Sequence, residues 1–254
     1  MGTFNFKKFS VVNERSSMKV NTDGVLLGAV MTITRSDGRF LDIGTGTGTI
    51  ALMAAQRIAE ISDVSQWPAI HIDAIDIDEP SASEAAENFN SSPWGNMLQA
   101  HNLSLGDFAV RCESILMEDE GLKYDLIFSN PPYFDNALQA PEERRNAARH
   151  TSTGLSYREI LDFAAKYLSA EGRVAMVLPA DTEQDLTRYA RMSGLHLHKI
   201  TRVRTVPRKN PIRIIAEFSR QRCPAPEDTL LTIQNEGQYT DQYLSLTKDF
   251  YLFA

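Results

Sequence analysis

Apolar positions along the chain alternate between short continuous runs and stretches that repeat every three or four residues. The run "RFLDI" at residues 39–43 predicts a buried strand, and "IHIDAID" at residues 70–76 predicts a second. A helix is expected after each strand. The first has an apolar stripe formed by Ile50, Met53, Ala54, Ile58 and Ile61, and the second begins near Pro80, which suits a helix first turn. The strand-then-helix order is typical of a parallel sheet.

The second half of the chain continues this order and then departs from it. "FAVRCESI" at residues 108–115 and "YDLIFSN" at residues 124–130 are expected as the third and fourth strands. Ser156 and Glu159 have the spacing of a capping box, and Gly172 is placed to end the helix that this box opens. The elements expected next are a strand at residues 173–179, a helix at 182–192 and a hairpin of strands at about 195–206 and 212–218.

These elements predict an α/β fold in one domain, 1–254. Its mostly parallel sheet carries an antiparallel edge strand and has helices on both faces. Residues 39–219 form the expected core, residues 1–38 an N-terminal segment, and residues 220–254 a C-terminal extension with a short helix and an aromatic tail. Residues 92–107 form a connection without an interpretable pattern.

Composition narrows the class of protein. Apolar residues make up 43% of the chain and charged residues 23%, which is ordinary globular usage. The sequence shows no signal peptide and no membrane-spanning run, so we expect a cytoplasmic protein without a membrane partner. The two cysteines, Cys112 and Cys223, are far apart, which argues against a disulfide framework or a metal site.

Basic residues cluster although the formal net charge is −7. Three groups, one of them Lys7, Lys8, Arg15 and Lys19 at the N-terminus, could contribute to one phosphate-binding face, or each could be ordinary solvated surface. From the other two groups, the expected substrate contacts are Arg144, Arg145, Arg149, Arg202, Arg204, Arg208 and Lys209.

A glycine-rich loop, "LDIGTGTGTI", follows the first strand. Glycine lets backbone approach a ligand closely, but Thr49 stands where a dinucleotide-binding loop needs its third glycine. The segment instead resembles the loop of class I S-adenosylmethionine-dependent methyltransferases. The resemblance implies a Rossmann-like, seven-stranded sheet and S-adenosylmethionine as cofactor, held by Asp42, Gly44, Gly46, Gly48, Asp76 and Ile77. It also implies an adenine contact after the third strand, at either Glu113 or Ser114.

The stretch "FSNPPYF" ends the fourth predicted strand. Because Pro131 and Pro132 lack N–H groups, the turn offers acceptors: the Asn130 side-chain oxygen and the Pro131 carbonyl. A group with two N–H donors, such as an exocyclic adenine amine, complements them, and Asn130 is also expected beside the cofactor. Tyr133, helped by Phe134, could stack on the base. The motif resembles that of amino-methyltransferases acting on adenine N6 or a glutamine amide.

Further segments, from "MKVNTDGVLLGA" to "YTDQYLSLTKDFYLF", resemble the bacterial family that methylates N6 of adenine 37 in tRNA1(Val). The resemblance implies a tRNA partner, no metal and a monomer, and makes Lys19, Thr22 and Asp23 candidates for enclosing the cofactor. Three alternatives stay open: another RNA substrate, a glutamine N5-methyltransferase and a non-catalytic RNA-binding scaffold. The glutamine enzymes carry a helical domain ahead of the core, for which residues 1–38 are too few.

Overall fold

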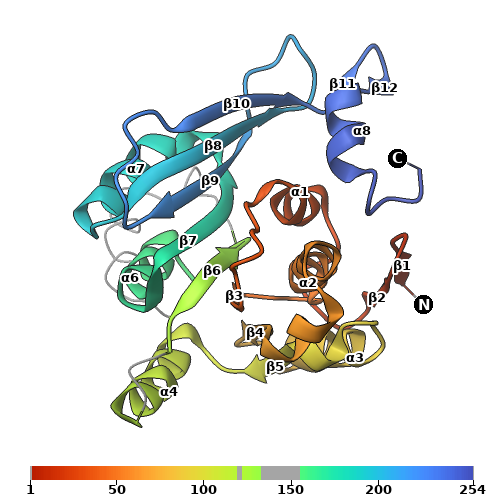
Figure 1. Ribbon diagram of the computed structural model, residues 1–254. Coiled ribbons are helices and arrows are strands. Elements are labelled where there is room, and N and C mark those ends of the chain that lie inside the picture. The colour runs from red at the N-terminus through yellow and green to blue at the C-terminus, as the bar shows by residue number, and fades with distance from the viewer. Residues whose placement is uncertain (1, 119–121, 133–154, 254) are drawn as a thin grey trace, which may run out of the picture.

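Eight strands form one sheet at the centre of the computed structural model, which describes residues 2–118, 122–132 and 155–253 (Figure 1). The strand order is β10-β8-β9-β7-β6-β3-β4-β5. In chain order the strands are β3 (Arg39–Ile43), β4 (His71–Asp76), β5 (Leu98–Asn102), β6 (Tyr124–Ser129), β7 (Leu168–Pro179), β8 (His196–Arg204), β9 (Arg213–Ser219) and β10 (Glu227–Thr232).

Strand directions confirm the predicted fold class. Strands β3 to β7 pair in parallel, and β9 is antiparallel to both of its neighbours, β7 and β8. The sheet has eight strands where seven were predicted, because β10 pairs in parallel with β8 and takes the outermost position. The predicted hairpin is confirmed as β8 and β9. Since β3, β4, β6 and β7 run in one direction, their carboxyl ends meet at one edge of the sheet.

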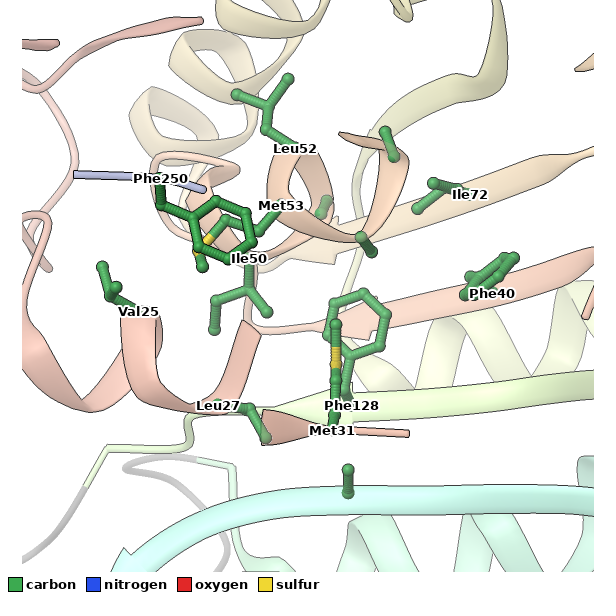
Figure 2. Close-up of a cluster of buried hydrophobic side chains, with 14 of the residues drawn as sticks. Val25, Leu27, Met31, Phe40, Ile50, Leu52, Met53, Ile72, Phe128 and Phe250 are labelled. Atoms are coloured by element: carbon green, nitrogen blue, oxygen red, sulfur yellow. The ribbon is translucent and has the colours of Figure 1, made fainter. Parts of the chain in front are cut away.

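Helices cover both faces of the sheet (Figure 1). One face packs against α1 (Thr22–Val30), α2 (Thr49–Ile61) and α3 (Glu79–Asn90), and Figure 2 shows Phe40 and Phe128 of the sheet in the same buried cluster as Ile50 and Met53 of α2. The other face packs against α4 (Leu105–Glu118), α6 (Tyr157–Tyr167) and α7 (Glu183–Met192). Short 3-10 turns lie at Val64–Ala69, Gly95–Met97 and Ala180–Thr182.

Two predictions from the sequence were wrong. Residues 108–115 belong to helix α4, where Phe108 and Cys112 are buried one turn apart while Val110 is exposed, so the apolar period is helical. The third strand is β5, inside the connection that the pattern left unread. Gly172 does not end a helix but lies within β7, where a Cβ atom would stand 2.6 Å from the Tyr124 carbonyl oxygen.

The two ends of the chain pack together beside α1 and α2. A hairpin, β1 (Thr3–Asn5) and β2 (Ser10–Val12), lies beside the tail that follows α8 (Asp241–Thr247) (Figure 1). The Lys7 backbone N–H donates to the Phe250 carbonyl at 2.8 Å, and Phe250 and Tyr251 are buried. A second hairpin, β11 (Gln234–Asn235) and β12 (Gln238–Tyr239), connects β10 to α8. The expected short helix and docked aromatic tail are therefore present.

Candidate active site

The glycine loop follows β3 at the carboxyl edge of the sheet. Gly44, Gly46 and Gly48 have φ angles of 72°, 56° and 79°, in the left-handed region that favours glycine. At Gly48 a Cβ atom would also lie 2.4 Å from Cε1 of Phe89, which helix α3 contributes. The loop leads into α2, whose N-cap Gly48 makes no side-chain cap. The first backbone N–H groups of α2 therefore receive no cap from this residue and lie next to the loop.

Asp42, the last residue but one of β3, lies under this loop. Its side chain is fully buried, and Thr45 Oγ1 donates to its Oδ2 at 2.7 Å. Its Oδ1 has no hydrogen-bond partner among the described residues. Burial, with a smaller contribution from the charge of Asp76, raises the pKa of Asp42 to about 7. An acceptor in this position is suited to bind a positively charged or N–H-bearing group.

Asp76 ends the neighbouring strand β4. Its two oxygens accept hydrogen bonds from the backbone N–H of Gly46 at 2.8 Å and of Asp78 at 2.9 Å. A carboxylate has about four lone-pair positions, so two remain for a ligand with adjacent hydroxyl groups. Burial raises the pKa of Asp76. The next residue, Ile77, is 77% exposed, which leaves an apolar side chain beside the carboxylate without a cover.

Asn130 stands at the end of β6, next to β3 in the sheet. The Ser129 hydroxyl donates to the Ile43 carbonyl at 2.6 Å and thereby ties the two strand ends together. The Asn130 side chain is 5% exposed, and its Nδ2 donates to the thioether sulfur of Met18 at 3.5 Å. Pro131 is buried. Tyr133, Phe134, Arg144, Arg145 and Arg149, which the sequence also suggested, lie outside the described residues.

One narrow cavity of about 30 Å³ joins the loop to Asn130. It is lined by the loop, by Asn130 and by the N-terminal segment from Met18 to Asn21. Such a volume holds little more than a water molecule.

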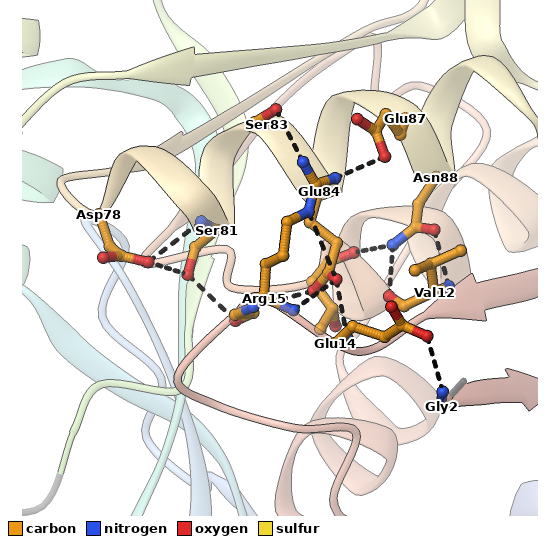
Figure 3. A network of polar contacts seen from close by, with 12 residues as sticks. Gly2, Val12, Glu14, Arg15, Asp78, Ser81, Ser83, Glu84, Glu87 and Asn88 are labelled. Atoms are coloured by element: carbon orange, nitrogen blue, oxygen red, sulfur yellow. Dashed lines mark hydrogen bonds and ion pairs between the residues drawn. The ribbon is translucent and has the colours of Figure 1, made fainter.

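Helix α3 fixes the chain that leads into this segment (Figure 3). The fully buried carboxylate of Glu84 accepts three successive backbone N–H groups, from Glu14 at 2.7 Å, Arg15 at 2.8 Å and Ser16 at 3.0 Å. Asn88, one turn later, donates to the carbonyls of both Val12 and Thr47 and so joins the segment to the glycine loop. Neither residue was predicted, because the sequence does not show which distant backbone groups an acid or an amide on a helix will bind.

The predicted residues of the N-terminal segment differ in position. Lys19 lines the cavity, and its Nζ donates to the Glu14 carbonyl at 2.8 Å. Thr22 and Asp23 belong to the first turn of α1, and Asp23 pairs with Arg213 of β9 at 2.8 Å. Met18, which touches Asn130, was not predicted.

The expectation for Glu113 and Ser114 fails with the strand on which it rested. Both lie within α4, where Glu113 pairs with Lys166 and the Ser114 hydroxyl donates to the Val110 carbonyl. The residue at the end of the true third strand is Asn102. Its Nδ2 donates to the carbonyls of Asp76 and Ile77, which places it next to the exposed Ile77 side chain.

The four predicted substrate contacts on the β8–β9 hairpin, Arg202, Arg204, Arg208 and Lys209, separate into two pairs. Arg202 is occupied by Glu183 and Asp228, and Arg204 donates to the Thr232 hydroxyl and the Pro207 carbonyl. Arg208 and Lys209 are exposed in the connection between the strands. The predicted phosphate-binding face is therefore reduced, on this hairpin, to Arg208 and Lys209.

Across residues 2–118, 122–132 and 155–253, no helix is both long and apolar enough to cross a membrane. Within the same ranges, no group of three or more His, Cys, Asp or Glu side chains is arranged to hold a metal ion.

Comparison with known proteins places this geometry in context. Residues 16–203 match the methyltransferase small domain family. A protein of Parabacteroides distasonis named tRNA1(Val) (adenine(37)-N6)-methyltransferase is 41% identical over 250 residues, covering 98% of this chain and 97% of its own. A protein of the same name from Trichodesmium erythraeum is 36% identical, with coverage of 98% and 97%.

Solved structures with a similar fold are more distant in sequence. A predicted O-methyltransferase of Agrobacterium tumefaciens superposes with a TM-score of 0.62 at 14% identity, covering 90% of this chain and 96% of its own. A putative class I S-adenosylmethionine-dependent methyltransferase of Listeria monocytogenes gives a TM-score of 0.54 at 14% identity, with coverage of 93% and 70%. The fold is that of class I methyltransferases.

Proposed function

The chain belongs to the methyltransferase small domain family and, within it, to the tRNA1(Val) (adenine(37)-N6)-methyltransferases, and we propose that it methylates N6 of adenine 37 in that tRNA. The observation that carries the proposal is the shared cavity of Asn130 and the glycine loop. It brings an amide able to hold an amine beside a loop able to hold the cofactor.

The described residues fit S-adenosylmethionine, which supplies the methyl group when bound. Asp42 Oδ1 lacks a partner among the described residues, and the Asp76 carboxylate keeps lone pairs for two ribose hydroxyls. Ile77 offers an exposed apolar side chain to an adenine ring. The left-handed glycines let backbone approach the ligand without Cβ atoms between them.

Asn130 and Pro131 are proposed to hold the target amine. The Asn130 oxygen and the Pro131 carbonyl are acceptors, and neither proline of the turn adds an N–H that would oppose the amine hydrogens. Two fixed acceptors turn the nitrogen lone pair out of the plane of the base and stabilise the positive charge that develops on nitrogen. No general base is needed beforehand, because the amine proton becomes acidic only after nitrogen has bonded. Tyr133 remains the proposed stacking platform.

Substitution of Asn130 tests this role. Asn130→Ala should lower the rate of methyl transfer to unmodified tRNA1(Val) about 100-fold or more, because one fixed acceptor is lost, while the affinity for S-adenosylmethionine stays near that of the unsubstituted protein. Asn96→Ala, which changes an exposed asparagine, is the matched control. Unchanged turnover in Asn130→Ala would reject the role.

The choice of nucleotide is tested with the RNA. Labelled methyl transfer should be lost when adenine 37 of the transcript is replaced by guanine. Transfer that persists would mean another target. Cofactor binding without transfer to any RNA would favour the scaffold alternative.

A further inference from the structure

Three exposed apolar side chains gather where the C-terminal tail meets the β11–β12 hairpin. Tyr239, Leu252 and Phe253 are 40%, 65% and 57% exposed, and we call the two rings among them, Tyr239 and Phe253, the aromatic patch. Phe250 and Tyr251, which precede Leu252 in the tail, are buried and pack the tail against the body. The exposure of the patch residues is therefore not explained by packing of the tail.

The rings of the patch are held in nearly parallel planes. The ring centroids of Phe253 and Tyr239 are 5.3 Å apart, with 16° between the ring planes. Those of Phe253 and Tyr251 are 4.7 Å apart, with 19° between the planes. Tyr239 stacks in turn on Tyr243, with ring centroids 4.9 Å apart and 24° between the planes. These centroid distances are those of offset rings, and the exposed fractions of Tyr239 and Phe253 show that part of each ring remains open to solvent. Their orientation is fixed before any ligand arrives, which lowers the entropic cost of stacking another flat ring on them.

The patch adjoins the basic hairpin. The backbone N–H groups of Ile233 and Gln234 donate to the carbonyls of Arg204 and Thr205, at 3.0 and 2.9 Å, and so attach the β11–β12 unit to the base of the connection that carries Arg208 and Lys209. Figure 1 shows this connection beside β11 and α8. Cations and open aromatic faces are thus neighbours on one surface, the combination that binds unpaired nucleotides.

The same surface continues to the candidate active site. Ser129 of β6 is level with Met176 of β7, which is level with Ala216 of β9 and Ile200 of β8. Three strand spacings separate β6 from β8, roughly 15 Å. Arg204 lies beyond this level, at the carboxyl edge to which Asn130 also belongs. An RNA that delivers a base to Asn130 passes close to the hairpin.

We propose that the aromatic patch stacks an unpaired base of the same RNA whose adenine reaches Asn130. The inference rests on the proposed function and adds a second contact, away from the target nucleotide. Phe253 and Tyr239 provide the stacking faces, and Arg208 and Lys209 meet the phosphates. Glu236 and Asp241 are exposed near the patch. Because their negative charge repels RNA phosphates, the affinity of the contact at the patch has to come from stacking on the rings.

The test compares ring removal with removal of an equally exposed aliphatic side chain. Binding of unmodified tRNA1(Val) to the full chain, with S-adenosylhomocysteine present, is measured by fluorescence anisotropy at several salt concentrations. Phe253→Ser and Tyr239→Ser should each raise the Kd between about 5-fold and 100-fold without changing its dependence on salt. Leu252→Ser should stay within about twofold, because no ring is lost.

Phe253→Leu separates stacking from apolar contact, since it keeps an apolar side chain without a π face. It should weaken binding nearly as much as Phe253→Ser. Unchanged binding in Phe253→Ser, or equal weakening in Leu252→Ser, would overturn the proposal, the second outcome indicating an apolar contact with a protein. The proposed function fails differently: the unsubstituted protein would then methylate no tRNA.

Discussion

Asp42 illustrates how a single side chain ties stability to the site. Its carboxyl group is completely buried beneath the glycine loop, and its pKa rises from 3.8 to about 7 because burial disfavours the charge. Between about pH 4 and 7, the Asp42 carboxyl group is therefore protonated in the folded protein and ionised in the unfolded chain. Across this interval the free energy of unfolding falls as pH rises. The Oδ1 oxygen of this carboxyl group has no hydrogen-bond partner among the described residues.

Replacing this carboxyl group with a neutral amide should remove the pH dependence. The free energy of unfolding of Asp42→Asn relative to that of the unsubstituted protein should rise by about 2–3 kcal/mol between pH 5 and pH 8, because the amide carries no charge whose burial becomes costly as pH rises. Urea unfolding at the two pH values measures the difference. Asp249→Asn, an exposed change of the same charge, is the control. A stability difference that does not grow with pH would contradict this assignment.

Residues with a local signal were placed correctly by the sequence. The positions of Gly44, Gly46 and Asp76 follow from the local pattern. A glycine loop directly after one strand and an acid at the end of the next strand meet at one edge of a parallel sheet. Met18 has no such signal. It reaches Asn130 only because the chain folds back over the loop, a contact across 112 positions of sequence.

At the scale of elements, strands and helices with strong apolar periods were predicted and edge elements were not. Strand β5 has the sequence "LQAHN", in which only Leu98 and His101 are buried, and it exists because β4 offers it a partner. Helix α4 was mistaken for a strand because Phe108, Val110 and Cys112 alternate, although Val110 faces solvent. Contacts with the rest of the fold decided both cases. Because α4 was taken for the third strand, the adenine contact was predicted at Glu113 and Ser114.

Helix α3 gives the element-scale prediction. Glu84→Gln should lower the free energy of unfolding by about 2–4 kcal/mol, because the amide nitrogen of glutamine would face a backbone N–H that now donates to carboxylate. It should also weaken S-adenosylmethionine binding, since the segment that Glu84 holds continues into the cavity wall. Urea unfolding and calorimetry give the two values.

Glu87→Gln provides the comparison within the same helix. Glu87 pairs with Arg15 in solvent and should contribute no more than about 0.5 kcal/mol. Hydrogen exchange at the Glu14, Arg15 and Ser16 amides should accelerate only in Glu84→Gln. Equal effects of the two substitutions would show that charge near Arg15, rather than the buried carboxylate, orders the segment.

The whole molecule combines an acidic surface with a local basic hairpin. A net charge of −7 repels RNA at a distance, so association depends on where the cations lie. Arg208 and Lys209 project at the carboxyl edge of the sheet, whereas Arg191 and Arg222 line a cavity at the start of β8, on the opposite edge. The two pairs carry the same charge at opposite ends of the strands.

Charge reversal at these two places separates location from total charge. The double substitutions Arg208→Glu with Lys209→Glu, and Arg191→Glu with Arg222→Glu, each change the net charge by four units, from −7 to −11. Only the first should abolish two phosphate contacts, lowering the slope of log Kd against log salt by about 1.5 and weakening tRNA binding at low salt. Anisotropy titrations at several salt concentrations measure both slopes. If the two doubles weaken binding equally, net charge governs association and the hairpin is not where the RNA docks.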